Sequence, residues 1–461
     1  MKFSNFRSVL GRRSCQFLAA ITGSLGILAS EMHFGWPSPA LPVLTNGTYF
    51  IHVSSEEASW LAVTIFPGIA CGALISNFLA DRFGRKKIIL ATGVPLFVSW
   101  LILALARNDI LLFLARFLGG VGGGLSFASV PMYLGEIAEP SIRGLLSSLC
   151  PVFVVMGILL INVLGIFLSI DLSAFLACVI PLIMFFTFIW MPESPIHLIA
   201  TNRQEEARKN LIIFRGKEEG EKEYWRLSKD LEESMSDQKG PGGFRDLFKV
   251  KSNRKALLIA LGLRSIQQMC GSTALTFYCK TIFQETESFI SANTATILYF
   301  SLQAVLAIFA SLVIDVFGRR PMFIFSLTGT TLTLFLMAVY LLLKMHLNMN
   351  LSGYTFVPVV CLLSNIAFFS MGVRNVPLLV ISEIFHPKIK PVALCFVTIY
   401  YGILAIIVTK FYHFTSETVE MSCPIFIFGI LSFASLIIYY LYVPETKGKT
   451  LEEIQNILKS S

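Results

Sequence analysis

The sequence predicts an all-helical membrane protein with twelve transmembrane helices in two similar halves, and three observations lead there. The chain is 55% apolar and only 14% charged, whereas a soluble domain carries about 25% charged residues. Apolar runs of roughly 20 residues, the length that crosses a bilayer, alternate with short polar segments. Charged motifs recur once in each half. Together these features predict a 6+6 architecture with inverted repeats.

Twelve apolar runs are long enough to form these helices. Those of the first half lie near 14–34, 58–80, 88–106, 110–134, 144–168 and 172–191. Those of the second half lie near 256–280, 293–314, 321–343, 354–382, 391–414 and 424–443. The first run is longer than the apolar core of a signal peptide and no small-residue cleavage site follows it, so we expect it to be helix one.

Polar segments divide the chain into four predicted parts. We expect an N-terminal six-helix bundle over 1–192 and a cytoplasmic linker over 193–255. A C-terminal six-helix bundle over 256–443 and a cytoplasmic tail over 444–461 follow. The linker carries many charges of both signs and contains helical stretches.

The net charge of +8 suggests nucleic-acid binding until the positions of the basic residues are considered. Of the 37 lysines and arginines, all but seven lie in segments on one predicted side of the membrane. Basic residues collect on the cytoplasmic side of membrane proteins. We therefore expect a plasma-membrane protein with both termini in the cytosol, in contact with the lipid bilayer and not with nucleic acid.

Two glycosylation sequons fall in loops that this orientation places outside, Asn46-Gly47-Thr48 and Asn350-Leu351-Ser352. Asn350 lies close to the predicted bilayer, whereas Asn46 lies in a longer loop, so Asn46 is the expected acceptor. None of the nine cysteines forms a CxxC pair, and most lie within apolar runs, where cysteine is a small packing residue.

A charged turn occurs at equivalent places in the two halves. The segment 81–87 reads Asp-Arg-Phe-Gly-Arg-Lys-Lys, and 315–320, which begins 234 residues later, reads Asp-Val-Phe-Gly-Arg-Arg. Glycine permits the bend, and the cations can lie against helix C-termini and acidic lipid with the aspartate as partner. Two copies at matching positions indicate a duplicated six-helix unit.

Further acidic and basic positions agree with the duplication. Glu136 and Arg143 follow the fourth run, and Glu383 follows the tenth. Pro192-Glu193-Ser194-Pro195 closes the sixth, and Pro444-Glu445-Thr446-Lys447-Gly448 closes the twelfth. This set resembles the sugar-porter family of the major facilitator superfamily over nearly the whole chain. The segment 36–42, Trp-Pro-Ser-Pro-Ala-Leu-Pro, resembles the insect facilitated trehalose transporter branch.

The resemblance implies two bundles that rock about a central site, with cytoplasmic charge clusters that latch the outward-open state. The residues that it implies as gates are Arg82, Arg85, Glu136, Arg143, Glu193, Arg319, Arg320, Glu383 and Glu445. Topology anchoring and lipid contact are the alternative role for these residues. The linker 193–255 resembles the family's bracing helical domain, the alternative being a solvated charged linker.

Polar residues in the seventh and eighth runs are the substrate candidates. The resemblance implies that Gln267 and Gln268 bind sugar hydroxyls, because amides donate and accept hydrogen bonds without charge. Thr273 stands at the place of a family asparagine, and Gln303 stands where relatives carry Asn or Gln. The alternative is that these side chains only join helices to one another.

Several positions depart from the family pattern. In the tenth run, 374–378 reads Arg-Asn-Val-Pro-Leu in place of Gly-Pro-Ile-Pro-Trp, and in the eleventh, Tyr401-Gly402 replaces Asn-Trp. Pro151 stands where relatives often have glutamine. A sugar is usually held by amides along its hydroxyls and an aromatic side chain under its ring. The chain keeps the amides and lacks two of the aromatic side chains.

The sequence therefore predicts a transporter of a sugar such as trehalose or a hexose by facilitated diffusion. A same-fold transporter of a polyol or an organic anion is the first alternative, and a non-transporting nutrient sensor is the second. The chain has no phosphate-binding loop, no metal-ligand spacing and no nucleophile motif. We therefore expect neither an enzyme nor a bound cofactor or metal.

Four of the charged or titratable residues within the predicted spans bear on proton coupling and on the charge of the solute. Glu31 and His33 are expected near the outer end of the first helix, facing an outer vestibule. The alternative is that they titrate during transport, since the resemblance implies an Asp at the place of His33 in proton-coupled members; we expect uptake without a proton gradient. Arg264 and Arg374 are expected about 12 Å from the cytoplasmic end of their helices, with no acidic residue at that depth. Either they extend toward the cytoplasm, or they form a positive vestibule that prefers an anionic solute.

Overall fold

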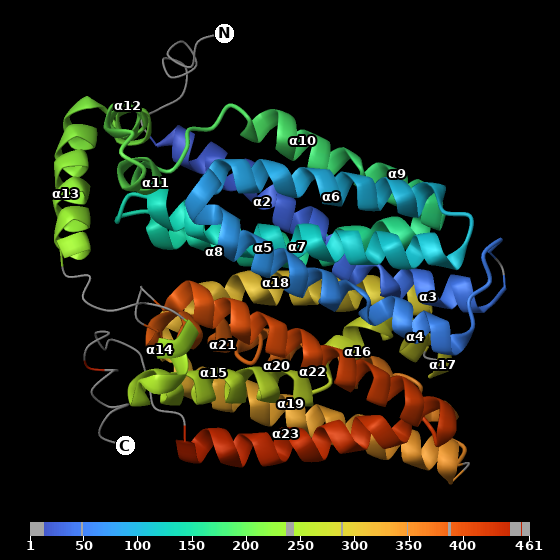
Figure 1. Cartoon of the computed structure of the whole chain (residues 1–461). Coiled ribbons are helices and arrows are strands. Elements are labelled where there is room, and N and C mark those ends of the chain that lie inside the picture. The colour runs from blue at the N-terminus through green and yellow to red at the C-terminus, as the bar shows by residue number, and fades with distance from the viewer. Residues whose placement is uncertain are drawn as a thin grey trace.

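The computed structural model describes residues 13–47, 49–236, 244–286, 289–347, 349–385, 389–442 and 453. Its described elements are helices, and they form two bundles that lie side by side, the first coloured blue to green and the second yellow to red (Figure 1). Long apolar helices suit a bilayer because a helix satisfies its backbone hydrogen bonds internally. The all-helical prediction is confirmed.

The first bundle contains the six apolar spans of the N-terminal half. Its helices are α2 (Ser14–Gly35), α3 (Pro37–Thr45), α4 (Ser55–Val63), α5 (Ile65–Phe83), α6 (Arg85–Leu105), α7 (Asp109–Ile137), α8 (Arg143–Phe167), α9 (Ile170–Ala177) and α10 (Val179–Phe188). Three spans consist of two helices each, α2 with α3, α4 with α5 and α9 with α10.

The second bundle also has six spans, one of which is irregular. Its helices are α15 (Lys251–Met269), α16 (Ser272–Phe277), α17 (Cys279–Glu285), α18 (Ala292–Phe317), α19 (Arg319–Leu341), α20 (Val357–Met371), α21 (Val376–Ile384), α22 (Lys390–Thr418) and α23 (Ser422–Tyr442). The π-helical turn η1 (Leu342–His346) extends α19, and the 3-10 turn η2 (Ser352–Tyr354) precedes α20. Eleven helices of the described residues are long and apolar enough to cross a membrane, and α15 to α17 make the remaining span.

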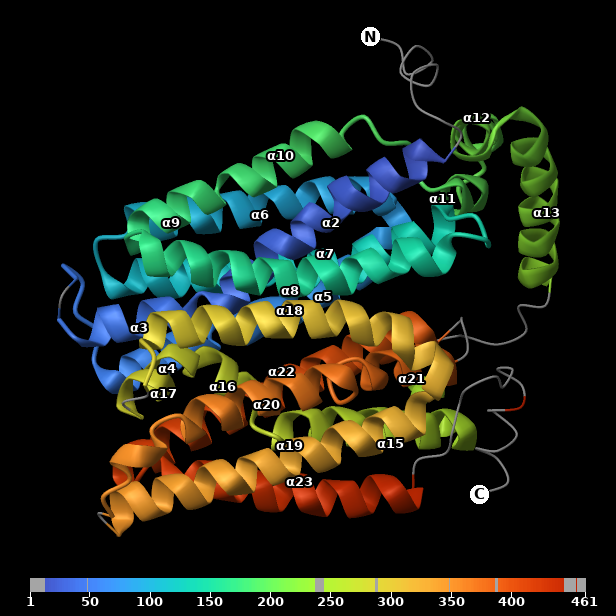
Figure 2. The ribbon, with the colours of Figure 1, turned by 180° about the vertical axis from the view of Figure 1, so that it is seen from behind.

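Four helices connect the bundles at one end of the molecule. They are α11 (Pro195–Ala200), α12 (Gln204–Arg215), α13 (Lys217–Ser236) and α14 (Phe244–Lys249). We call the end at which α11 to α14 lie the linker end. The opposite end, where α3, α4 and α17 lie, is the far end; both are visible in Figures 1 and 2.

The duplicated charged turn has the same geometry in both bundles. Gly84 lies between α5 and α6, Gly318 lies between α18 and α19, and each has φ of +94°. Glycine adopts this backbone conformation without the steric cost that a Cβ imposes. The internal repeat predicted from the sequence therefore extends to the backbone conformation of its turns.

Glycines bring α5 and α7 into backbone contact within the first bundle. A Cβ added at Gly72 would lie 2.1 Å from the carbonyl oxygen of Val121, and one added at Gly124 would lie 2.2 Å from that of Ile69. Small residues allow helices to pack closely in membranes, where burial away from water does not drive association. The backbones of α5 and α7 therefore pack against each other without intervening side chains at these glycines.

The two bundles meet along a few helices. The long contacts are α8 against α18 and α5 against α22, and α3 and α2 also touch α17 and α16. The faces of α2, α5 and α8 therefore lie opposite those of α16, α18 and α22. Side chains on these faces are the candidates for a site shared by the two bundles.

Candidate functional site

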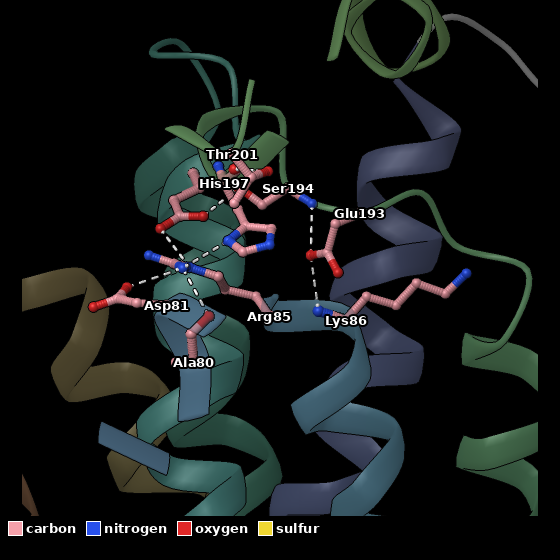
Figure 3. Close-up of polar contacts among 9 residues, drawn as sticks. Ala80, Asp81, Arg85, Lys86, Glu193, Ser194, His197 and Thr201 are labelled. Carbon is pink, nitrogen blue, oxygen red and sulfur yellow. Dashed lines mark hydrogen bonds and ion pairs between the residues drawn. The ribbon is translucent and has the colours of Figure 1, made fainter. Parts of the chain in front are cut away.

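The linker end of the first bundle holds a charged cluster around Arg85 (Figure 3). The Arg85 Nε lies 3.0 Å from a Glu136 carboxylate oxygen, and its Nη1 lies 3.1 Å from Asp81 and donates to the Ala80 carbonyl at 2.9 Å. That Nη1 is also 3.3 Å from Nδ1 of His197, which must accept because a guanidinium only donates. The Arg85 and Glu136 side chains are 11% and 13% exposed, so the pair is largely withdrawn from water.

Glu193 ties the same cluster to the segment that follows α10. Its Oε1 accepts from the backbone N–H groups of Lys86 at 3.0 Å and Ser194 at 2.9 Å. The Ser194 hydroxyl donates to Glu136. A Cβ at Gly84 would lie 2.4 Å from Glu193 Oε2, so the carboxylate also requires glycine in the turn. The structure thus brings the predicted Arg85, Glu136 and Glu193 into one network.

His197 belongs to this network although no sequence motif singles it out. Its side chain is buried at the start of α11, and burial lowers its pKa below the ordinary value. The neighbouring charge of Arg85 lowers the pKa further, against the opposing effect of Glu193 and Asp81. A neutral imidazole is the form that can accept from Arg85.

The second bundle carries a smaller version of the cluster. Arg319 Nη2 lies 3.0 Å from Glu383 Oε1, which repeats the arginine-to-glutamate pair of the first bundle. Arg320 Nη2 donates to the Tyr440 carbonyl at 2.6 Å, and its guanidinium lies 5.4 Å from the centre of that ring. Arg319 and Glu383 are therefore paired as the duplication predicts, whereas Arg320 binds the end of α23.

Three other predicted gate residues do not join these clusters. Arg82 and Arg143 are exposed, and neither forms an ion pair with a described residue. The Arg82 guanidinium instead lies 5.6 Å from the centre of the Phe83 ring. Glu445 lies outside the described residues.

Two helices of the second bundle are interrupted, and the interruptions touch each other. Gly271, between α15 and α16, has φ of +71°, and a Cβ there would lie 2.3 Å from the Phe428 ring. Residues 372–375 form a turn between α20 and α21. The Gln267 amide Nε2 donates to the Arg374 carbonyl at 3.2 Å and so joins the two breaks. Solute sites of membrane transporters are typically built at such discontinuous helices.

The predicted substrate residues lie at or near this junction. Both the nitrogen and the oxygen of the Gln267 carboxamide form hydrogen bonds, since its Oε1 also accepts from Arg264 at 2.8 Å. Gln268 is fully buried and its Oε1 accepts from the Thr273 hydroxyl at 2.9 Å. Its Nε2 has no partner among the described residues, and neither does Oε1 of the buried Gln303 on α18. The structure thus joins Gln268 to Thr273, while no hydrogen bond brings Gln303 to them.

The expectation that Glu31 lies near the outer end of the first span is wrong. The span that contains Glu31 runs from Ser14 to Thr45 because α3 continues it, so Glu31 lies in its middle and not at its outer end. Arg264 does not extend toward the linker end, since it binds Gln267 one turn deeper and lies 4.8 Å from the centre of the Tyr401 ring.

The expectation that His33 faces an outer vestibule is also wrong. His33 is fully buried inside the first bundle, where its Nε2 lies 2.8 Å from the Ser99 hydroxyl and its ring stacks on Trp100 at 3.8 Å. Its carbonyl accepts from the buried Arg116, which also donates to two carbonyls of α4. His33 and Arg116 therefore hold α2, α4, α6 and α7 together.

At the far end, side chains of the two bundles bind each other directly. Lys410 on α22 lies 2.6 Å from a Glu56 carboxylate oxygen on α4 and donates to the Ser59 hydroxyl at 2.7 Å. Its Nζ is 4.2 Å from the centre of a Trp60 ring. His413, one turn along α22, lies 3.4 Å from the same glutamate. We call these five residues the far-end lock.

Aromatic side chains close the interface between the far-end lock and the interrupted helices. The Phe277 ring on α16 lies 4.9 Å from Phe34 and 6.1 Å from Phe66 of the first bundle. A Cβ added at Gly402 would lie 3.4 Å from Phe66. The glycine that replaces a family tryptophan on α22 thus gives room to a phenylalanine from the opposite bundle.

Asn46, the expected glycosylation acceptor, is exposed just after α3 at the far end. Thr48 of its sequon lies outside the described residues. Nearby, the Tyr49 hydroxyl donates to Asp171, and burial together with this carboxylate raises the pKa of Tyr49.

Comparisons with known proteins agree with this architecture. Residues 14–458 match the family described as "Sugar (and other) transporter". The chain belongs to the sugar transporter family. It is 32% identical over 446 residues to a facilitated trehalose transporter Tret1 of Bombyx mori, covering 96% of this chain and 87% of the relative. It is 35% identical to the Tret1 of Drosophila virilis, covering 95% of this chain but only 48% of that relative.

The fold is that of the major facilitator superfamily. The inward-open xylose transporter XylE of E. coli superposes with a TM-score of 0.79 at 20% identity, covering 96% of this chain and 99% of XylE. XylE bound to 6-bromo-6-deoxy-D-glucose, described as a proton:xylose symporter, superposes with a TM-score of 0.75 at 21% identity. The predicted twelve-helix family architecture is confirmed, and the protein is a multi-pass membrane protein.

Some residues at the interface of this transporter are not evident from the sequence. Glu56 and Lys410 each occur in a polar stretch near a span end, and their pairing becomes visible only when the bundles are assembled. Phe34, Phe66 and Phe277 are three of 40 phenylalanines, so composition carries no signal for them. The sequence does carry a signal for the depth of Glu31. Pro37 follows α2 after a single residue, and since Pro is favoured in the first turn of a helix, it indicates that a further helix continues the span beyond Glu31.

Proposed function

We propose that this protein carries a neutral sugar, trehalose or a hexose, across the plasma membrane by facilitated diffusion. The observation that carries the proposal is the junction of the two interrupted helices. There, Gln268 presents a buried amide N–H group that has no partner among the described residues. An unsatisfied buried donor costs about 1–3 kcal/mol, and a solute hydroxyl can remove that cost.

Alternating access is the mechanism that this arrangement favours. On this proposal, residues 1–192 and 256–443 are the rocking bundles, 193–255 braces them, and 444–461 is the tail. The basic linker end faces the cytosol by the positive-inside rule, so both termini are cytoplasmic. Asn46 at the far end is then extracellular and open to glycosylation.

The gate residues act at the two ends of the solute path. The Arg85 and Arg319 clusters are the cytoplasmic elements, and the far-end lock closes the extracellular side in the described conformation. Facilitated diffusion without a proton gradient follows from the placement of His33, which is held by Ser99 and Trp100 inside one bundle and does not face the solute path. The names of the insect relatives support the same mode of transport.

The experiment is uptake of radiolabelled trehalose and D-glucose into proteoliposomes that contain the full chain. We expect saturable uptake that stops when the internal and external concentrations are equal, with or without an imposed proton gradient. Protein-free liposomes are the control. Uptake that exceeds the external concentration, and that collapses with the proton gradient, contradicts facilitated diffusion. Absence of uptake for every sugar contradicts the proposed function.

A further inference from the structure

A strip of basic residues marks the start of the first helix of the second bundle. Lys249 ends α14, and Lys251, Arg254 and Lys255 lie in the first turns of α15. The first three side chains are exposed, and that of Lys255 is half-buried. Figure 1 shows α15 beginning at the linker end, between α22 and α23. We call these four residues the α15 basic strip.

The α15 basic strip lies beside apolar side chains that are open to lipid. Lys251, Lys255 and Leu258 are spaced by four and three residues, so they share one face of α15. Leu258 is 62% exposed, and Phe248 and Val250, on either side of Lys249, are 41% and 43% exposed. Basic and apolar groups thus alternate where the helix enters the membrane, as in segments that bind at a bilayer interface.

The fold does not neutralise these charges. Among the described residues, the side chains of Lys249, Lys251 and Arg254 form no hydrogen bond and no ion pair. The Lys255 Nζ lies beneath the surface, also without a partner in the described part of the chain, and an unpaired buried ammonium is costly. By contrast, Arg13 at the start of the first span pairs with Glu139 at 3.2 Å. The first bundle supplies a partner for its cation, whereas the second leaves its cations to an outside group.

The helix dipole adds to the positive charge of the strip. A helix N-terminus carries a partial positive charge and favours acidic residues nearby. The first turn of α15 contains no acidic residue, and no side chain caps its N–H groups. Asp246, the nearest acidic residue along the chain, precedes the strip by three residues. Because cations disfavour a helix start and anions bind there readily, the arrangement suits an anion supplied from outside.

The positive-inside rule explains why basic residues gather at the linker end. It does not explain why these four lack partners and lie beside exposed apolar side chains. Other exposed lysines of the linker end differ in both respects. Lys217 and Lys222 of α13 lie among the glutamates 218, 219, 221 and 223, so that helix presents mixed charge.

We propose that the α15 basic strip binds the phosphate-bearing headgroup of an anionic phospholipid in the cytoplasmic leaflet. The choice of leaflet rests on the proposed function, which places the linker end in the cytosol. The ammonium and guanidinium groups donate charge-assisted hydrogen bonds to the phosphate, and the exposed apolar side chains contact the acyl chains. The cytoplasmic leaflet carries the anionic lipids that basic clusters next to a span attract. A lipid bound in this position fixes the start of the second bundle at the membrane surface.

The experiment measures lipid binding to delipidated full-length protein by native mass spectrometry. The probes are phosphatidylglycerol, phosphatidylcholine with the same acyl chains, and glycerol 3-phosphate as a soluble headgroup. We expect wild type to bind phosphatidylglycerol at least about tenfold more tightly than phosphatidylcholine, and glycerol 3-phosphate not at all. Lys251→Gln with Arg254→Gln should weaken phosphatidylglycerol binding about 25-fold, since each surface cation contributes roughly fivefold, and should leave phosphatidylcholine binding unchanged.

Two further double variants make the result decisive. Lys217→Gln with Lys222→Gln removes the same charge from α13 and should bind phosphatidylglycerol as wild type does. Lys251→Arg with Arg254→Lys keeps both charges and should keep the lipid preference. Melting temperatures of all variants separate a loss of lipid binding from poor folding.

Several results overturn the proposal. Equal affinity of wild type for the two lipids does so, as does a folded Lys251→Gln, Arg254→Gln protein that binds phosphatidylglycerol like wild type. An equal loss in the α13 variant shows attraction to total charge only, and tight binding of glycerol 3-phosphate makes the strip a site for a soluble phosphate. The measurement in detergent depends neither on orientation nor on sugar, so accessibility of terminal tags and sugar uptake test the proposed function separately.

Discussion

The linker end and the far end of the transporter use ion pairs in different ways. At the linker end, the Arg85–Glu136 and Arg319–Glu383 pairs each lie within one bundle. At the far end, the Lys410–Glu56 pair joins one bundle to the other, as does the hydrogen bond from Ser55 to Glu417. The pairs within a bundle stabilise that bundle, whereas the pairs between the bundles stabilise the conformation in which the far end is closed.

Exposure separates the two ends as well. The Arg85 and Glu136 side chains are 11% and 13% exposed, whereas Glu56 is 65% exposed. Breaking a buried pair by removing one partner costs about 3–5 kcal/mol, whereas exposed pairs contribute at most about 1 kcal/mol. A stable linker-end cluster and a weak far-end lock suit a molecule whose bundles stay intact while their contact opens.

The largest expected effect is on the linker end. Arg85→Gln leaves Glu136 and His197 without their shared partner, so we expect a loss of about 3 kcal/mol of stability. Thermal unfolding in detergent measures it. Arg82→Gln, three residues earlier and exposed, is the matched control and should change stability by less than about 0.5 kcal/mol. Equal effects from the two variants would show that the cluster is only a surface feature.

The next effect concerns the site between the two ends. Gln268→Leu removes the unpaired amide and the acceptor of Thr273, and we expect sugar affinity to fall by about tenfold to a hundredfold. Uptake kinetics at equal surface expression measure it. Gln204→Leu, exposed at the start of α12, is the control. Unchanged kinetics in Gln268→Leu would remove the solute site from the seventh span.

Local patterns predict the linker-end clusters because each bundle is encoded by contiguous sequence. The turn 81–87 and its copy 315–320 contain their own glycine, arginine and aspartate, so the bends at Gly84 and Gly318 follow from the local pattern alone. The family motif then supplies Glu136 and Glu383 as partners. Span length and charge distribution likewise predict the twelve-helix architecture.

Contacts between the bundles cannot be predicted in the same way. Lys410 and Glu56 are 354 residues apart, and no local pattern links them. The prediction for Glu31 is wrong because the length of an apolar run differs from the length of the span, which α3 continues from Pro37 onward. An error in the predicted depth of a residue within the membrane matters most for charged residues, because their role depends on the groups that lie beside them at that depth.

A moderate effect is expected from opening the far-end lock. Lys410→Met removes the ion pair with Glu56, the bond to Ser59 and the contact with the Trp60 ring. We expect about 1 kcal/mol, or roughly a fivefold change in the equilibrium between closed and open far ends. Hydrogen exchange of the backbone amides in 49–64 measures the opening, and it should become faster.

The matched control for the far-end lock is Lys222→Met, which removes an exposed lysine of the linker helix α13. Its exchange in 49–64 should equal that of wild type. Should Lys410→Met also leave exchange in this segment unchanged, the ion pair does not hold the bundles together, and the aromatic contact of Phe277 with Phe34 is then the element that closes the far end.

The smallest effect is a pH dependence of the linker end alone. The pKa of His197 lies below its ordinary value, chiefly because the imidazole is buried and further because of the Arg85 charge. The folded state therefore binds this proton less readily than the unfolded state, whose histidine has an ordinary pKa of about 6.5. Stability is unaffected above that pH and falls as the pH drops through it.

Melting temperatures between pH 8 and pH 5 should show this decrease in wild type, and His197→Gln should reduce it, since glutamine still accepts from Arg85 but does not titrate. If His197→Gln retains the full decrease, other groups titrate in this range and the imidazole does not link the cluster to pH.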